Sequence, residues 1–429
     1  MRFDKTNSAT GRSRRRFLQA SALGTAAAAD MTFLNVLRAP ALAEELQRHD
    51  KRVILLWLAG GPSQVETWDP KPGASTGGPF AKITTDVPGV EISELLPQLG
   101  QRMKHTAVIR SLNTQIGDHG NAYKLMETGR RAEPGIEFPH MGAVLAKELG
   151  RADSKVPDYV SMYTSTEGRS KGTAGFLGAR YGEMFLTEQM MPENLRRLDT
   201  ISDTDHSDRA ALRQLLADRF TRGIESPAVN SQNSAYQRVR GLMSSDHLFD
   251  IEQEPAAMRA KYGPTQFGEQ CLIARRLSEA GTPFVKVARA WWDSHGQNFE
   301  THQELCADLD HSMSALLDDL SDRGMLDHTL VIALGEFGRT PRINGSLGRD
   351  HFAKAWSCTL SGCGIKGGAV YGKTDEKGET VVDGEINAGD LFATILEAVG
   401  IEHDKEYMLG SRPIPLSDFG SSPVSDVLA

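Results

Sequence analysis

The sequence has few cysteines, no long apolar run and no excess of basic residues. Four cysteines among 429 residues exclude a small fold held together by disulfides. No run approaches the roughly 20 consecutive apolar residues of a transmembrane helix, so no membrane-spanning segment is expected. Lysine and arginine number 48 against 56 acidic residues, a formal net charge of −8, which argues against nucleic acid as a partner. A large globular protein is the class that remains.

The cysteines fall into two pairs. Cys271 and Cys306 lie on apolar stripes of expected helices, which indicates core positions. Cys358 and Cys363 flank a short turn and could form a disulfide, but their spacing alone does not supply the required geometry.

The N-terminus has the features of an export signal. Residues 13–19 read Ser-Arg-Arg-Arg-Phe-Leu-Gln, and a small, apolar run over 20–29 and an Ala-Leu-Ala exit at 41–43 follow. Paired arginines before Phe-Leu are typical of twin-arginine signals. We therefore expect residues 1–43 to be a signal peptide read by the twin-arginine export machinery, and the product to be soluble and periplasmic or secreted. A basic N-terminal tail is the alternative.

Apolar strands alternate with amphipathic helices from residue 44 to residue 429. Continuous apolar runs at 53–59, 284–288 and 329–334 are typical of central strands covered on both faces. A helix with one apolar stripe is expected after Asp293. This alternation predicts an α/β domain with a mostly parallel sheet and helices on both faces. Charged, glycine-poor segments at about 190–262 indicate a helical insertion.

Carboxylates and imidazoles follow the ends of several expected strands. Asp293 and His295 come after one strand, Glu336 comes after the next, and His351 lies in the loop beyond. These positions share one edge of an open α/β sheet, so they can converge on a divalent metal ion. Arg339 offers planar donors for a phosphate, sulfate or carboxylate group. The alternatives are unrelated loop residues and a structural pair between Glu336 and Arg339.

Three other polar residues are weaker candidates for the functional site. His119 opens a helix, a position that suits anions, and Ser63 follows the first strand but has no identified base to activate it as a nucleophile. His302 lies on the apolar stripe of its helix, so we expect a core histidine there.

Five motifs together carry a family resemblance. They are Gly-Gly-Pro-Ser-Gln (60–64), Trp-Asp-Pro-Lys-Pro (68–72), Trp-Asp-Ser-His-Gly (292–296), Gly-Glu-Phe-Gly-Arg-Thr-Pro (335–341) and Gly-Arg-Asp-His (348–351). With these motifs the chain resembles the exported, sulfatase-like family catalogued as domain of unknown function 1501. That family is similar to the alkaline phosphatase and sulfatase superfamily. The resemblance implies an alkaline phosphatase-like fold that hydrolyses phosphate or sulfate esters at a metal site.

The resemblance also shows departures from the superfamily pattern. The usual nucleophile, nine residues before Thr128, falls on His119. The Asp-His pair that binds metal falls on residues 336–337, Glu-Phe, and the later histidine falls on His351. The first acidic ligands fall on residues 60–61, Gly-Gly. A metal would therefore depend on other side chains here.

These observations together predict an exported hydrolase that depends on a divalent ion such as zinc, manganese or calcium. Its substrate would be a small-molecule or polysaccharide ester. Arg339 would receive the anionic group, metal-activated water would attack, and His119 and Ser63 are the catalytic candidates. The alternative is a non-catalytic envelope protein that uses the same fold for binding. The expected metal ligands are Asp293, His295, Glu336 and His351.

Overall fold

Contacts within the computed structural model divide the chain into two units after His49, and the second unit, Asp50–Ala429, is compact. The signal peptide predicted over residues 1–43 lies outside the described residues. These are residues 50–151, 154–163, 172–186, 190–192, 198, 200–220, 222, 236, 241, 243 and 245–429.

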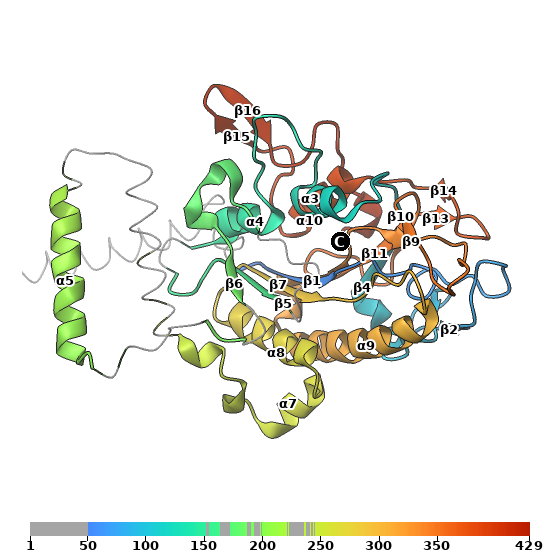
Figure 1. The fold of residues 1–429 in the computed structure, drawn as a ribbon, viewed down its shortest axis with the longest axis horizontal. Helices are drawn as coiled ribbons and strands as arrows, with labels where there is room; N and C mark the ends of the chain where they lie inside the picture. Colours follow the sequence, from blue (N-terminus) through green and yellow to red (C-terminus); the bar gives the residue numbers. More distant parts are fainter. Residues whose placement is uncertain are drawn as a thin grey trace, which may run out of the picture. The chain divides into compact units, whose positions relative to one another are not determined.

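An eight-stranded sheet forms the centre of the second unit, in the order β12-β4-β11-β8-β1-β7-β5-β6 (Figure 1). Strand β1 pairs in parallel with both β7 and β8, and all strands of this sheet but one run in the same direction. The strands are β1 (Arg52–Leu58), β4 (Thr106–Leu112), β5 (Tyr159–Tyr163), β6 (Met184–Leu186), β7 (Phe284–Arg289), β8 (Thr329–Leu334), β11 (Trp356–Gly362) and β12 (Val370–Tyr371).

Strand β11 is the exception and runs antiparallel to β4 and β8. The connection from β8 to β11 covers residues 335–355 and contains no helix, only the short antiparallel pair β9 (Gly338–Arg339) and β10 (His351–Phe352). A parallel return would require a crossover to the other end of the sheet. The connection therefore stays at the edge where β8 ends.

Helices cover both faces of the sheet and enclose two buried apolar clusters. On one face the core includes side chains of α3 (His119–Thr128), α4 (Met141–Leu149) and α10 (Ala388–Ala398). On the other it includes side chains of α8 (Gln266–Glu279) and α9 (Asn298–Asp322), as Figure 1 shows. The predicted α/β class, with a mostly parallel sheet and helices on both faces, is confirmed.

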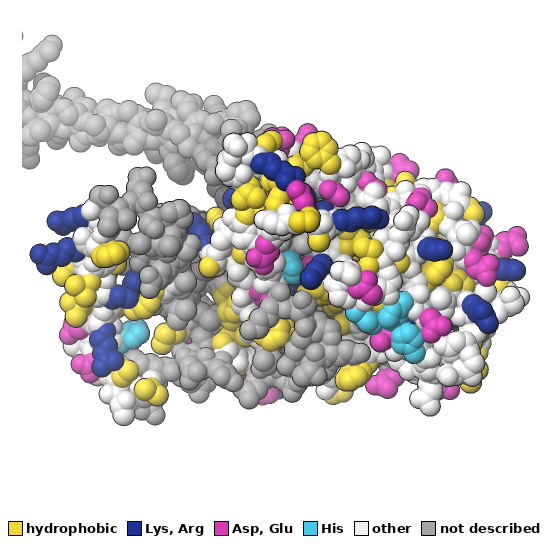
Figure 2. Space-filling view, turned by 45° about the horizontal axis from the view of Figure 1, so that its top comes forward, with side chains coloured by type: hydrophobic (Ala, Val, Ile, Leu, Met, Phe, Trp, Pro, Cys, Tyr) yellow, Lys and Arg dark blue, Asp and Glu magenta, His cyan; other side chains and the backbone are white. Residues whose placement is uncertain are grey.

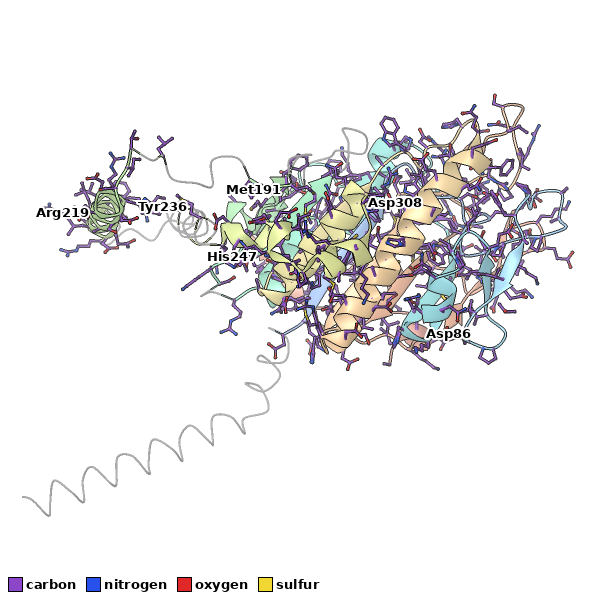
Figure 3. The ribbon with its side chains drawn as sticks, turned by 90° about the horizontal axis from the view of Figure 1, so that it is seen from below. Asp86, Met191, Arg219, Tyr236, His247 and Asp308 are labelled. Carbon is purple, nitrogen blue, oxygen red and sulfur yellow. The ribbon has the colours of Figure 1, made fainter. Side chains whose placement is uncertain are left out.

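Figure 3 views the unit from the side of α8 and α9. Asp308 of α9, labelled there, accepts hydrogen bonds from Thr265 Oγ1 at 2.7 Å and from Arg289 Nε at 2.7 Å. It thereby links α9 to the N-cap of α8 and to the last residue of β7. The long helix expected after Asp293 is α9, and it holds the end of β7 in place.

The remaining elements are short or lie in the predicted insertion. Within residues 190–262 the described helices include α5 (Asp203–Phe220) and α7 (Ala256–Tyr262). The four cysteines are buried and free. No described helix combines the length and apolar character needed to cross a membrane. The other strands are β2 (Lys82–Thr84), β3 (Glu91–Ser93), β13 (Lys373–Thr374), β14 (Val381–Asp383), β15 (Glu406–Leu409) and β16 (Arg412–Pro415).

Candidate functional site

The candidate site lies where the parallel strands end. Gly60 follows β1, Asp293 follows β7 and Glu336 follows β8, while the loop after β4 leads to His119 at the start of α3. Because these strands are parallel, their carboxyl ends share one edge, where ligand sites form in open α/β sheets. Figure 2 shows histidine side chains gathered at one place on the surface with carboxylates beside them.

Asp293 is the centre of this group. Its Oδ1 lies 3.1 Å from His295 Nε2 and 3.1 Å from His351 Nε2. Its Oδ2 lies 3.2 Å from His119 Nε2. The exposed side-chain fractions are 42% for His119, 47% for His295 and 24% for Asp293, so solvent and small solutes can reach the group.

Each of the three histidines also has a partner for its other ring nitrogen. The carbonyl oxygen that faces His351 can only accept, so His351 Nδ1 carries the proton, and the same tautomer suits the other two rings. In the neutral form each Nε2 then presents a lone pair toward Asp293. The Nδ1 partners are Glu336 Oε1 for His119 at 2.8 Å, Asp350 Oδ1 for His295 at 3.0 Å and Gly117 O for His351 at 2.7 Å.

This arrangement fits a metal ion. His295 Nε2 and His351 Nε2 are 3.0 Å apart, so two nitrogen lone pairs face each other unless a proton or a cation lies between them. Bonds of about 2.0–2.2 Å to tetrahedral zinc place neighbouring ligand atoms about 3.3 Å apart. Ligand atoms of His119, Asp293 and His351 all lie within 4.8 Å of one another. Metal-bound histidines usually donate their other ring N–H to such acceptors.

Electrostatics keep the central carboxylate ionised. Burial would raise the pKa of Asp293, but its contacts with His119 and His351, which donate to it when those rings are protonated, and the charge of Arg339 hold it well below its usual range. Hydrogen bonds to Asp293 and Glu336 raise the pKa of His119 to about 9. The hydrogen bond with His295 lowers the pKa of Asp350. Without a bound cation His119 is therefore an imidazolium that donates to both carboxylates, and a metal ion would take the place of its Nε2 proton.

Glu336 lies behind His119. Its Oε1 accepts from the backbone N–H of Gly60 at 2.9 Å and faces His119 Nδ1 at 2.8 Å. The sequence suggests Glu336 as a metal ligand, whereas the structure places this oxygen on the nitrogen that points away from Asp293. Its Oε2 is buried and has no hydrogen-bond partner in the described part of the chain. The carboxylate is placed to orient His119.

Arg339 lies beneath the site, and an anion-binding role does not fit this position. Its side chain has no exposed surface. Its Nε donates to Gly61 O at 2.9 Å, and its Nη2 donates to Gly60 O and to Asp293 Oδ1. The pairing of β9 with β10 places Arg339 opposite His351 and turns its side chain inward. The guanidinium therefore orients Asp293 and joins the loops after β1 and β7.

Ser63 and His302 form a separate buried contact. The N–H of Ser63 donates to His302 Nε2 at 2.9 Å, and His302 Nδ1 donates to Asn298 O at 2.9 Å. Burial lowers the pKa of His302 to about 4, so this ring is neutral, and the predicted core histidine is confirmed. Ser63 Oγ is buried without a hydrogen-bond partner among the described residues, and no base there activates it as a nucleophile.

Phe337 belongs to the site, although the resemblance to the superfamily assigned it no role there. Its fully buried ring packs 5.0 Å from the ring of His119 and 4.4 Å from that of His351, measured between centroids. It forms an apolar floor under two of the imidazoles. Asp350, next to His351 in sequence, faces His295 Nδ1, a contact that only the fold of the loop could reveal.

Comparisons with known proteins give a family and similar folds. A family model described as "Protein of unknown function (DUF1501)" matches residues 50–428. No curated protein matches the sequence.

Several solved structures have a similar arrangement of sheet and helices. A mutant TAB5 alkaline phosphatase with Mg bound is 13% identical, with a TM-score of 0.40 over 82% of this chain and 98% of that chain. The PsFucS1 sulfatase from Pseudoalteromonas sp. is 11% identical, with a TM-score of 0.37 over 84% and 71%. Murine ectonucleotide pyrophosphatase/phosphodiesterase 5 in complex with AMP is 8% identical, with a TM-score of 0.38 over 88% and 100%.

Proposed function

This chain belongs to the family of proteins of unknown function DUF1501, and from the geometry of its site we propose that it is a metal-dependent hydrolase of phosphate or sulfate esters. One observation carries the proposal. Three imidazoles have their Nδ1 atoms held by acceptors and turn their Nε2 atoms toward one carboxylate, that of Asp293. This is the arrangement that histidine ligands of a metal adopt.

Asp293, His119, His295 and His351 would hold the ion. Glu336, Asp350 and the carbonyl of Gly117 orient the three rings, and Arg339 orients Asp293. These contacts restrict the rotation of the ligand side chains, so less conformational entropy is lost on binding.

A divalent ion bound there would polarise the ester and lower the pKa of water toward neutrality, so that water can attack without a side-chain nucleophile. The protein supplies a half-exposed face formed by His119 and His295, through which an ester can approach. Phe337 closes the opposite side of the His119 and His351 rings and keeps water from that side.

The test is metal content together with hydrolysis. Protein purified without chelator should contain a stoichiometric divalent ion, measured by elemental mass spectrometry, and should hydrolyse at least one of a panel of aryl phosphates, phosphodiesters and aryl sulfates. His351→Ala should lose both properties. His328→Ala is the matched control, because His328 is exposed and precedes β8 at the opposite edge of the sheet. Wild-type protein without metal and without activity on the panel would refute the proposal.

A non-catalytic binding protein remains the second candidate. The observation in its favour is that Ser63 Oγ and all four cysteines are buried, which leaves none of them available as a nucleophile. Stoichiometric metal without turnover of any ester in the panel would favour this candidate.

We also propose export by the twin-arginine route, because the pattern at residues 13–19 is typical of its signals. Replacing Arg14 and Arg15 by lysine should retain the full-length precursor in the cytoplasm of a bacterial host. Cell fractionation measures this, and unchanged export of the variant would refute the route.

A further inference from the structure

A positively lined cleft begins next to the candidate site. It has a volume of about 490 Å³ and lies between the loop 115–118, the exposed side of α3 and the turn 130–132. Two of its lining residues connect it to the site. Gly117 O accepts from His351 Nδ1 at 2.7 Å, and Asp118 directly precedes His119. A molecule whose reacting group lies at Asp293 can therefore extend into this cleft.

The charges that line the cleft are mainly positive. Lys124 and Arg131 are exposed, and neither has an ion-pair partner within the described ranges. Arg130 is buried, and its Nη2 is held by three backbone carbonyls at 2.6–2.7 Å rather than by a carboxylate. The lining carboxylate of Asp118 is engaged as the N-cap of α3, where it accepts from Asn121 N at 3.0 Å.

This local excess contrasts with the whole chain, whose formal net charge is −8. A concave surface lined by one sign of charge concentrates the electric field and attracts ligands of the other sign. Lys124 and Arg131 form no ion pair with the described residues, so both side chains are available to bind a ligand.

We propose that this cleft binds a second anionic group of the substrate, so that the ester hydrolysed at Asp293 belongs to a short polyanion carrying phosphate or sulfate on neighbouring units. The identity of the reacting ester rests on the proposed function, whereas the binding of an anionic group in the cleft does not. Nucleic acids and anionic membranes fit less well, because a chain of net charge −8 repels long or flat polyanions outside the cleft.

A charge-reversal variant tests the cleft. The double variant Lys124→Glu, Arg131→Glu is compared with Lys104→Glu, Lys366→Glu, which changes the net charge by the same amount. Lys104 and Lys366 are exposed and lie at the opposite edge of the sheet, before β4 and after β11. Titration calorimetry with a dextran sulfate oligosaccharide, and with uncharged dextran of the same length, measures binding to each protein.

Wild type and the control should bind dextran sulfate and not dextran, with an affinity that falls as salt rises. The Lys124→Glu, Arg131→Glu variant should bind about tenfold more weakly or not at all. Equal affinity of wild type for the two polymers would overturn the inference. An equal loss in both double variants would overturn it too, because it would show an effect of net charge alone. Tighter binding of duplex DNA or of anionic vesicles than of dextran sulfate would overturn the inference too, because it would show that nucleic acid or a membrane is the ligand.

Metal content and hydrolysis of a small aryl phosphate separate the two proposals. A small ester does not reach the cleft, so the Lys124→Glu, Arg131→Glu variant should keep its metal and its activity on such an ester. Absence of metal and activity in wild type, with dextran sulfate binding intact and sensitive to the variant, would refute the hydrolase and leave the cleft established. Intact metal and activity with no selective binding would refute the cleft alone.

Discussion

Lys286 and Glu127 form an ion pair that is completely buried between β7 and α3. Lys286 Nζ also donates to Tyr123 Oη at 2.8 Å and lies 4.8 Å from the centre of the Trp57 ring. The pair joins two elements that lead to the candidate site, because β7 continues to Asp293 and α3 begins at His119. The distance between these two site residues thus depends on a charge pair within the core.

Breaking this pair should strongly destabilise the fold. Lys286→Met leaves the Glu127 carboxylate buried without its cation, which typically costs about 3–5 kcal/mol of unfolding free energy. Equilibrium unfolding in urea measures the change. The double variant Lys286→Met, Glu127→Gln should lose less than Lys286→Met alone, because no buried charge of the pair remains. A cost below about 1 kcal/mol for Lys286→Met would contradict this account.

The same pair should make stability depend on pH in the acid range. Burial alone would raise the pKa of Glu127, but Lys286 and His140 together lower it from 4.5 to about 2. A carboxylate with a lowered folded-state pKa stabilises the fold above its unfolded-state pKa, and this stabilisation is lost as the pH falls. The expected window is therefore pH 4.5 down to 2.

Thermal unfolding across that window checks the expectation. In the double variant Lys286→Met, Glu127→Gln neither group titrates, so the melting temperature should fall less steeply between pH 4.5 and pH 2 than in wild type. Parallel curves for the two proteins would show that Glu127 is not the group responsible.

The acceptors behind the histidines should determine metal affinity. Asp350→Ala removes the partner of His295 Nδ1 and frees the ring to rotate, so the affinity for the ion should fall by about tenfold, the lower end for this kind of contact. Asp350→Asn keeps an acceptor oxygen and should lose less. Competition with a chelator of known affinity measures both variants, and wild-type affinity in Asp350→Ala would show that this contact does not orient the ligand.

The fold could be predicted well from the sequence, because its signal is local. The apolar run at 53–59 appears as β1, the run at 329–334 appears as β8, and the apolar stripe after Asp293 appears as α9. Each pattern arises because burial on one or both faces requires apolar residues at a regular spacing within one short segment of the chain. The antiparallel direction of β11 carried no such signal, since it follows from the path of the preceding connection.

The site could be predicted in several of its members but not in its contacts. The rule that parallel strands end at one edge brings Asp293, His295 and His351 together, as the structure shows. Which nitrogen faces which oxygen depends on loop conformations that spacing does not encode. Arg339 illustrates this limit, because its donors suit an anion and the carbonyls of Gly60 and Gly61 equally well.

Gly348, in the loop before His351, makes a close backbone contact with residue 295. A Cβ added at Gly348 would lie 1.9 Å from the carbonyl oxygen of His295, a distance that real Cβ atoms do not reach. At Gly345, in the same loop, an added Cβ would meet nothing within 4 Å. Gly348→Ala must therefore separate the loop from residue 295, whereas Gly345→Ala requires no movement.

The contact between Gly348 and residue 295 keeps His295 Nε2 and His351 Nε2 3.0 Å apart. Displacing the loop should therefore weaken metal binding while the protein stays folded. We expect Gly348→Ala to reduce the bound metal per chain severalfold while urea unfolding remains cooperative, and Gly345→Ala to match wild type in both measurements. Full metal content in Gly348→Ala would mean that the two histidines do not need this close approach, and the ligand set proposed around Asp293 would have to be revised.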